Sequence, residues 1–312
     1  MSYLIIYTDG ASDDLIAILL GLRNKEGMRI SAITTVAGAV EVEQAEANVG
    51  SLLGLADADI PLIRGAAKPL IRPLENEAAI RAHGPSGVAG VELPSGSGNS
   101  LPGPAAQSII EAARDHPHML TVVCIGPVTN LALALRLDSS LASLLDNIIV
   151  SSGTVTAPGN VVPAADFNFW IDPEAAAIVL SSGARITMVP WDRYVESAVL
   201  SEAELSSTRA AASKVGQLLL DANEGIAEIT GSITPHDSGL VIGDTLAVAI
   251  AQKPELALEI RPFHVAVETA SQLTRGVSVV DVYGVTNNET NVDVVLEIDR
   301  NAFLPLLIGA LT

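Results

Sequence analysis

Three carboxylates stand close together near the start of the chain: Asp9, Asp13 and Asp14. They follow an apolar β-type run, residues 3–8, and precede an apolar segment that predicts a helix over residues 15–23. Carboxylates this close repel one another and stay ionised together only where something positive compensates. Oxygen ligands are typical of a hard cation such as Ca²⁺ or Mg²⁺. A plainer interpretation makes Asp13 and Asp14 partners of the helix N-terminus, but it does not explain Asp9.

Three further polar segments follow predicted strands, where ligands of open α/β sheets bind. Residues 124–130 place a Gly-Pro turn after a buried strand, and the free carbonyls of such a turn can face a ligand. Residues 159–168 carry two amides and a carboxylate, which can hydrogen-bond a polyol. Asp244 begins a later helix. A simple turn, ordinary loop chemistry and a helix cap explain the three segments equally well when each is taken alone.

The elements that must position these residues alternate between strand and helix. This alternation predicts βαβ units with right-handed crossovers, and so an α/β fold with a mostly parallel central sheet and helices on both faces. The Gly-, Pro- and Ser-rich residues 84–104 are interpreted as a surface loop because the alternation resumes after them, so residues 1–312 are expected to form one domain. The predicted strands are 3–8, 29–36, 60–63, 119–124, 148–152, 185–189, 261–267, 277–283 and 292–298, and the predicted helices 15–23, 42–55, 104–115, 128–137, 172–181, 201–231, 244–251 and 302–311.

Composition excludes several classes of protein. Apolar residues make up 49% of the 312 residues and aromatic residues only 3%, which predicts a large aliphatic core. The formal net charge of −19 repels phosphate backbones, so nucleic acid is not an expected partner. Cys124 is the sole cysteine, which excludes an internal disulfide and a Cys-rich zinc site. Residues 15–22, an early apolar run, are too few to cross a bilayer, and no signal peptide is evident, so a cytoplasmic protein without membrane contact is expected.

Taken together, the segments resemble the inosine–uridine-preferring nucleoside hydrolase family. The family's opening Asp-x-Asp-x-Gly-x-Asp-Asp motif corresponds to residues 7–14, and its Gly-Pro-Leu-Thr-Asn turn to residues 126–130. The order of the matching segments along the chain is also that of the family. The other matches are residues 33–38, 83–94, 158–168, 172–176, 244–248 and 267–276.

The resemblance implies hydrolysis of the N-glycosidic bond of a ribonucleoside, giving ribose and the free base, with Ca²⁺ as the cofactor. The implied calcium ligands are Asp9, Asp14, the main-chain carbonyl of Ile125, and Asp244. Asp9 is also implied as the general base that activates a metal-bound water. Members of the family are commonly homodimers or homotetramers, and the same is expected here.

The ribose is implied to lie among polar side chains. Asp13 and Asn168 would hold its 2′- and 3′-hydroxyls, and Asn160 and Asp166 would lie near the 5′-hydroxyl. Cleavage of such a bond passes through an oxocarbenium-like sugar, whose positive charge carboxylates stabilise. Holding both hydroxyls of the diol also orients the reacting atoms.

Four positions depart from the family pattern. Tyr7 replaces the first Asp of the motif, Ala39 an expected Asn, and Asp166 a Glu. Gly243 stands where a His often precedes the late Asp and is thought to protonate the leaving base in several members. Another group must then serve the leaving base, although a lone loop His is more often solvated and a Trp more often packed. The candidates are His83, His236, Trp170 and Trp191.

Two alternatives come from other classes of protein. A ribose- or nucleoside-binding protein that has lost hydrolysis is favoured by Gly243 and Ala39, while Asp9 argues against it. A haloacid-dehalogenase-type phosphatase would need a nucleophilic Asp at Tyr7, so it is disfavoured. Within the hydrolase hypothesis, the altered base side predicts an unusual base specificity.

Overall fold

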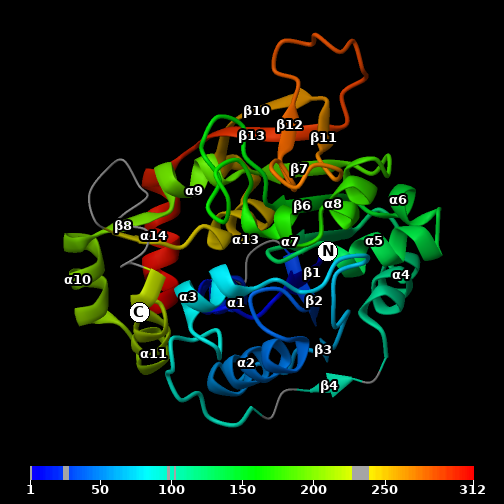
Figure 1. The fold of residues 1–312 in the computed structure, drawn as a ribbon. Helices are drawn as coiled ribbons and strands as arrows, with labels where there is room; N and C mark the ends of the chain where they lie inside the picture. Colours follow the sequence, from blue (N-terminus) through cyan, green and yellow to red (C-terminus); the bar gives the residue numbers. More distant parts are fainter. Residues whose placement is uncertain (1, 24–27, 97–98, 102, 227–238) are drawn as a thin grey trace.

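The computed structural model describes residues 2–23, 28–96, 99–101, 103–226 and 239–312. A nine-stranded sheet runs through the middle of the molecule (Figure 1). Its strands are β1 (Ser2–Thr8), β2 (Met28–Thr35), β3 (Leu62–Ile63), β4 (Ser100–Leu101), β5 (Leu120–Cys124), β6 (Asn147–Ser151), β7 (Ile186–Val189), β10 (Ala257–Phe263) and β13 (Val292–Ile298).

The strands of this sheet lie in the order β10-β13-β7-β6-β5-β1-β2-β3-β4. Every neighbouring pair is parallel except β10 and β13. The predicted mostly parallel sheet is therefore confirmed. Two small antiparallel pairs lie apart from it, formed by β8 (Val199–Ser201) with β9 (Gly239–Val241) and by β11 (Val265–Val267) with β12 (Ser278–Val280).

Helices cover both faces of the sheet (Figure 1). They are α1 (Ser12–Arg23), α2 (Val42–Leu55), α3 (Glu77–His83), α4 (Ala105–Asp115), α5 (Thr129–Leu137), α6 (Leu141–Leu144), α7 (Phe167–Ile171), α8 (Pro173–Leu180), α9 (Trp191–Ser197), α10 (Glu202–Ala211), α11 (Lys214–Ala222), α13 (Asp244–Gln252) and α14 (Arg300–Leu311), with a 3₁₀ turn, η1 (Pro254–Leu256).

Alternate residues of β1 face opposite layers of the core, as the pleat of a strand requires. Leu4 and Ile6 belong to the cluster that includes residues of α1, α13 and α14. Ile5 and Tyr7 belong to a second cluster with residues of α4, α5 and α8. Both faces of the strand are thus buried, which explains why residues 3–7 form a continuous apolar run rather than an alternating one.

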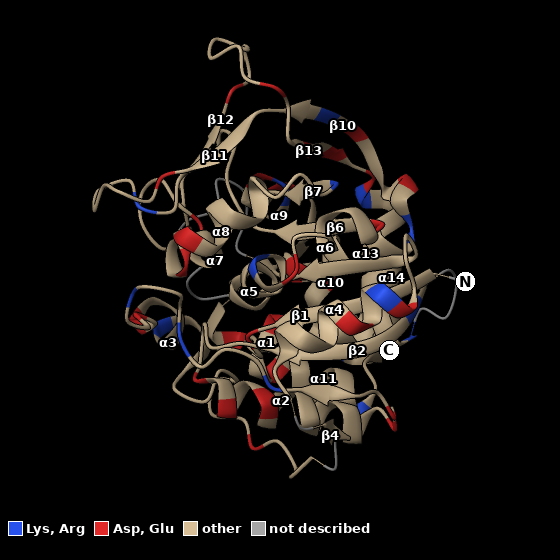
Figure 2. Cartoon of the chain, turned by 90° about the vertical axis from the view of Figure 1, so that its right-hand side faces the viewer, with Lys and Arg blue, Asp and Glu red and all other residues tan. Residues whose placement is uncertain are grey.

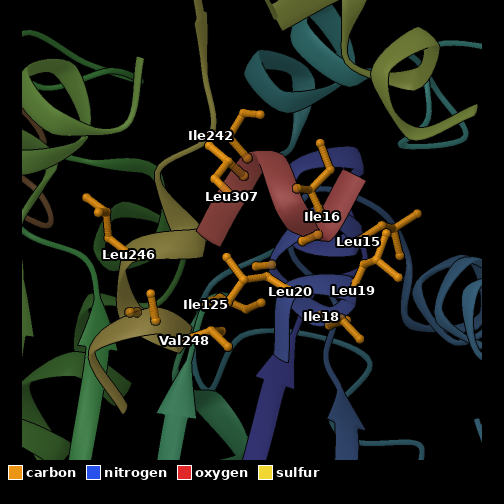
Figure 3. Packing of buried hydrophobic residues seen from close by; sticks show 14 of the residues in the cluster. Leu15, Ile16, Ile18, Leu19, Leu20, Ile125, Ile242, Leu246, Val248 and Leu307 are labelled. Carbon is orange, nitrogen blue, oxygen red and sulfur yellow. The ribbon is translucent and has the colours of Figure 1, made fainter. Parts of the chain in front are cut away.

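Helix α1 is buried around almost its whole circumference. It packs against α13 and α14, where leucine, isoleucine and valine side chains interdigitate (Figure 3). The helix begins at Ser12, three residues before the predicted start, and its first turn carries the acids Asp13 and Asp14. A helix that is largely buried therefore fixes the position of two charged residues.

Several short elements were not predicted from the sequence. Helices α3, α6, α7 and α9 and strands β4, β8 and β9 have ten or fewer residues each, too few to show a clear periodicity. The strand predicted over 261–267 is two strands, β10 and β11, which separate at His264. The helical prediction for 201–231 is met by α10 and α11, and residues 227–231 lie outside the described chain.

Hydropathy along the helices gives one further result. Within the described ranges, no helix combines the length and the apolar character needed to cross a bilayer. Acidic positions outnumber basic ones along the chain (Figure 2).

The packing around α1 leads to a stability prediction. We expect Ile16→Ala to lower the free energy of unfolding by about 2–5 kcal/mol, because Ile16 is fully buried and its loss leaves a cavity. Urea unfolding measures the change. The matched control is Ile71→Ala, since Ile71 is 75% exposed and its loss should change stability by about 0.5 kcal/mol or less. Equal effects of the two substitutions would contradict the packing described here.

Candidate active site

The site lies where the direction of strand addition reverses. Strands β1 to β4 extend the sheet to one side, and the chain then returns to place β5, β6 and β7 on the other side of β1. A crevice opens at the carboxyl ends of the strands at such a switch point. Asp9 follows β1, Ile125 follows β5 and Ser151 ends β6, so all three lie at this edge of the sheet.

Four carboxylates converge there from two distant parts of the chain. Asp9, Asp14 and Asp244 are 3%, 1% and 7% exposed, and Asp13 is partly buried. One carboxylate oxygen from each of Asp13, Asp14 and Asp244 lies within 4.8 Å of the others. Asp244 reaches this group because α13, which it begins, packs against α1. The convergence of Asp244 with the first acidic turn, predicted only from the resemblance, is thus present in the structure.

Asp9 is held by a close approach of two loops. Its Oδ2 accepts a hydrogen bond from the main-chain N–H of Ala39 at 2.7 Å. A Cβ at position 38 would lie 2.1 Å from the same oxygen, so Gly38 is required for this contact. The expected Asn side chain is absent at Ala39, but the main chain of that residue still orients the carboxylate.

Asp14 faces back toward the turn that precedes its own helix. Its Oδ2 accepts hydrogen bonds from Thr8 Oγ1 at 2.6 Å and from the main-chain N–H of Gly10 at 2.9 Å. The plainer interpretation of Asp14 as a partner of the helix N-terminus is therefore correct in part. These bonds also fix the carboxylate beside Asp13 and Asp244, so the two interpretations describe the same geometry.

The phenol of Tyr7 occupies the position of the missing first acid. Tyr7 is fully buried, and its hydroxyl accepts a hydrogen bond from the main-chain N–H of Asn130 at 3.1 Å. Burial raises the pKa of Tyr7 well above its usual value, so the phenol stays neutral. The substitution replaces a carboxylate by a neutral group that holds the Gly-Pro turn.

Without a bound cation, burial and mutual repulsion make the ionised form of these acids unfavourable. Burial raises the pKa of Asp14 well above its usual value, and the charges of Asp9 and Asp244 raise it further. Burial is also the largest cause of the raised pKa of Asp244, to which the charge of Asp13 adds. Burial likewise raises the pKa of Asp9.

Within the described chain, no Lys or Arg forms an ion pair with these four acids. His83 Nδ1 lies 3.8 Å from Asp13 Oδ1 and 3.0 Å from Ser12 Oγ, so it touches the cluster only at its edge. The donor set is made of oxygen atoms and carries excess negative charge. That chemistry fits a hard divalent cation.

Asn168 joins the acidic cluster to the strand ends. Its Nδ2 donates to the carbonyl oxygen of Ile125 at 3.2 Å and to that of Ser151 at 3.1 Å. The Ile125 carbonyl therefore points toward the polar side of the site, as the metal-ligand hypothesis requires. Asn168 lies in α7, a short helix that follows the loop containing Asn160.

Asp166 is engaged mainly in holding the loop. Its carboxylate accepts hydrogen bonds from Ser152 Oγ at 2.7 Å, the N–H of Gly153 at 2.7 Å and the N–H of Asn168 at 3.0 Å. It is the N-cap of α7. The Asp166 carboxylate, one methylene shorter than the expected Glu, is therefore hydrogen-bonded to main-chain N–H groups.

A cavity of about 210 Å³ opens beside these groups. Ten of the twelve residues predicted for the site line it: Asp9, Asp13, Asp14, His83, Ile125, Asn160, Asp166, Asn168, Trp191 and Asp244.

Of the other two predicted residues, Trp170 is not among those lining the cavity. The guanidinium of Arg275 lies over the ring of Trp170 at 4.1 Å, and its Nε donates to the Trp170 carbonyl at 2.8 Å. Trp170 is thus engaged by Arg275, as the packing interpretation expects. His236 lies outside the described residues.

Four residues with polar side chains line the cavity without having been predicted: Arg81, Ser151, Ser152 and Tyr194. Arg81 reaches it from α3, and Tyr194 from α9. No sequence signal marked Arg81, because α3 was not predicted. The unusual Gly243 was the signal for Tyr194, since the two residues are in direct contact.

Comparison with known proteins agrees with this geometry. Residues 4–305 match the family described as inosine-uridine preferring nucleoside hydrolase. The chain belongs to this family. The resemblance predicted from the sequence and the fold class are both confirmed.

Relatives of this nucleoside hydrolase cover nearly its full length. It is 36% identical over 300 residues to the non-specific ribonucleoside hydrolase RihC of Klebsiella pneumoniae subsp. pneumoniae, spanning 96% of this chain and 95% of that protein. It is 34% identical over 305 residues to the pyrimidine-specific ribonucleoside hydrolase RihA of Salmonella enteritidis, spanning 97% and 96%. The solved purine-preferring ribonucleoside hydrolase from Gardnerella vaginalis has a TM-score of 0.90 at 27% identity, with 99% and 98% coverage. As a nucleoside hydrolase, the protein is an enzyme that acts on N-glycosyl bonds.

The raised pKa of Asp244 predicts how the stability of the metal-free nucleoside hydrolase depends on pH. The folded state retains a proton that the unfolded chain, with a pKa near 3.8, has released. The contribution of this carboxyl to stability is therefore greatest below that value and is lost as pH rises through the raised folded pKa. We expect Asp244→Asn, which cannot ionise, to flatten the resulting fall in stability at pH values above the unfolded pKa. Chemical unfolding at a series of pH values in the presence of a chelator measures how the free energy of unfolding depends on pH.

Asp138→Asn is the control of opposite sign. Hydrogen bonds from Ser140 lower the pKa of Asp138, so this carboxylate contributes stability above its unfolded pKa, which is lost as pH falls. Its substitution should lower stability at neutral pH. An unchanged pH slope for Asp244→Asn would show that burial does not keep this carboxyl protonated.

Proposed function

We propose that the protein is a calcium-dependent nucleoside N-ribohydrolase, which converts a ribonucleoside and water to ribose and the free base. One observation carries the proposal. Buried carboxylates, a main-chain carbonyl and an amide meet at one cavity, and no Lys or Arg of the described chain forms an ion pair with the acids. Such a site suits a cation, a diol and a positively charged transition state together.

The proposed cation ligands are Asp9, Asp14, Asp244 and the carbonyl oxygen of Ile125. Their oxygen-only chemistry favours Ca²⁺, which accepts irregular geometry more readily than Mg²⁺ does. When bound, such a cation fixes vicinal hydroxyls and lowers the pKa of water. A cation would also relieve the repulsion that raises the pKa of Asp14.

Asp9 acts as the general base in this proposal. It accepts a proton from the attacking water as the water oxygen bonds to the anomeric carbon and the bond from that carbon to the base nitrogen breaks. The Ala39 N–H at 2.7 Å orients the carboxylate for this transfer. The surrounding carboxylates stabilise the positive charge that develops on the sugar.

The sugar is positioned by residues on both sides of the acidic cluster. Asp13 accepts hydrogen bonds from the ribose diol, and Asn168 binds it from the side of the Ile125 carbonyl. Asn160 and Asp166 are assigned to the 5′-hydroxyl. For Asp166 the support is its place in the cavity wall, since its carboxylate is also bonded to Ser152 and Gly153.

The base side of the cavity is assigned to His83 and Trp191, which both line it. The relatives are named as non-specific, pyrimidine-specific and purine-preferring, so their names support no single base for this chain. Gly243 supports an altered leaving-group chemistry, since it carries no side chain to protonate the base. A homodimer or homotetramer stays a prediction, which sedimentation velocity tests.

A nucleoside panel tests the proposal directly. The chelator-treated protein should release no reducing sugar, and adding Ca²⁺ back should restore release from at least one ribonucleoside. A folded, calcium-loaded sample that releases sugar from none of them would refute hydrolysis. If that sample still bound nucleoside in calorimetry, the binding-protein alternative would replace the proposal.

Substitution of the general base should separate chemistry from binding. We expect Asp9→Asn to lower kcat by about 10²- to 10⁴-fold, because the amide cannot accept the proton of the attacking water. Initial rates and nucleoside calorimetry at saturating calcium measure the two effects. Asp115→Asn, an exposed change at the end of α4, is the control and should keep wild-type kcat. A kcat for Asp9→Asn within a factor of ten of wild type would exclude Asp9 as the base.

Recognition of the diol predicts discrimination against deoxyribose. A site that hydrogen-bonds a substrate hydroxyl rejects the analogue that lacks it by about 10⁴-fold, so kcat/KM for a 2′-deoxynucleoside should be lower by that order. Asp13→Ala should reduce the ratio of kcat/KM for the ribonucleoside to kcat/KM for the 2′-deoxynucleoside, since one hydrogen-bond partner of the diol is then missing. Equal discrimination in wild type and Asp13→Ala would place the diol elsewhere.

A further inference from the structure

The ring of Tyr194 fills the space above Gly243. A Cβ at position 243 would lie 1.7 Å from Cδ2 of Tyr194 and 2.1 Å from its Cγ. Gly243 has ordinary right-handed helical dihedral angles, φ −66° and ψ −39°, so it is not the backbone that requires glycine here. The requirement is steric, because a side chain at 243 and the ring of Tyr194 exclude each other.

The hydroxyl of Tyr194 contacts the acidic cluster. It donates to Oδ1 of Asp244 at 3.2 Å and is also hydrogen-bonded to Oγ of Ser151. A phenol has one proton, so while Tyr194 donates to Asp244 the Ser151 hydroxyl must be the donor to Tyr194. The order Ser151 to Tyr194 to Asp244 links the end of β6 to the start of α13.

The position of Tyr194 is fixed by the short helix that carries it. Asp192, on the same helix, accepts hydrogen bonds from the N–H groups of Val155 and Thr156 at 2.8 and 2.7 Å. The rings of Trp191 and Tyr194 meet edge to face, with centroids 5.5 Å apart. Tyr194 is only 8% exposed, so its ring has little room to turn away.

We propose that Tyr194 is a positioning residue of this site. Its ring forms the part of the cavity wall that a side chain at 243 would otherwise form. Its hydroxyl fixes the carboxylate of Asp244 in the orientation that a bound cation needs. The inference rests on the proposed function, in which Asp244 is a cation ligand.

Calcium titration of Tyr194→Phe tests the hydroxyl. The ring is kept and the donor to Asp244 is lost, so the calcium Kd measured by calorimetry should rise about 10- to 100-fold. Excess calcium should restore nucleoside turnover. Tyr283→Phe is the control, because Tyr283 is 92% exposed and its loss should leave the calcium Kd unchanged. A wild-type Kd in Tyr194→Phe overturns the inference, whereas a wild type that binds no calcium overturns the proposed function itself.

Thermal unfolding of a double-mutant cycle tests the ring. Gly243→Ala should lower Tm in the wild-type background, where the ring blocks the new methyl group. In a Tyr194→Ala background the same change should leave Tm unchanged or raise it, since the methyl group then has space. Gly309→Ala, at a helical glycine with no atom within 4 Å of its added Cβ, is the control in both backgrounds. An equal fall in Tm in the two backgrounds overturns the steric exclusion.

Discussion

Repulsion among buried carboxylates at the carboxyl ends of β1, β5 and β6 is the constraint on which the rest of the structure depends. Asp9, Asp14 and Asp244 are each oriented by main-chain or hydroxyl donors, yet no Lys or Arg of the described chain is paired with the acids. Well-packed elements of the fold hold these charges close together. The first turn of α1 carries two of the acids, and the remainder of that helix is anchored in the larger part of the aliphatic core (Figure 3).

The fold and the acidic half of the site could be predicted from the sequence for a physical reason. Buried parallel strands are short apolar runs, and the residues that follow them must lie at one edge of the sheet. Asp9 and Ile125 follow such runs directly, so their proximity is a consequence of the topology. Asp13 and Asp14 are neighbours of Asp9 along the chain, so their proximity to Asp9 could be predicted without knowledge of long-range contacts.

Other parts of the site depend on contacts that one sequence does not reveal. Trp170 and Trp191 are the same residue type, but Arg275 covers the first and the second lines the cavity. Tyr194 and Asp244 are separated by 50 residues and meet only because α9 and α13 approach each other. Gly243 by itself indicated a missing group, and only the structure shows which ring lies in its place.

Helix α9 has seven residues and contacts two separate segments that line or lead to the cavity. Asp192 is hydrogen-bonded to the loop that leads to Asn160, while Tyr194 is hydrogen-bonded to Asp244. Any displacement of this two-turn helix would shift the loop that leads to Asn160 and the carboxylate of Asp244 together. A substitution within this short helix would therefore alter the cavity wall while the four clustered acids stayed the same.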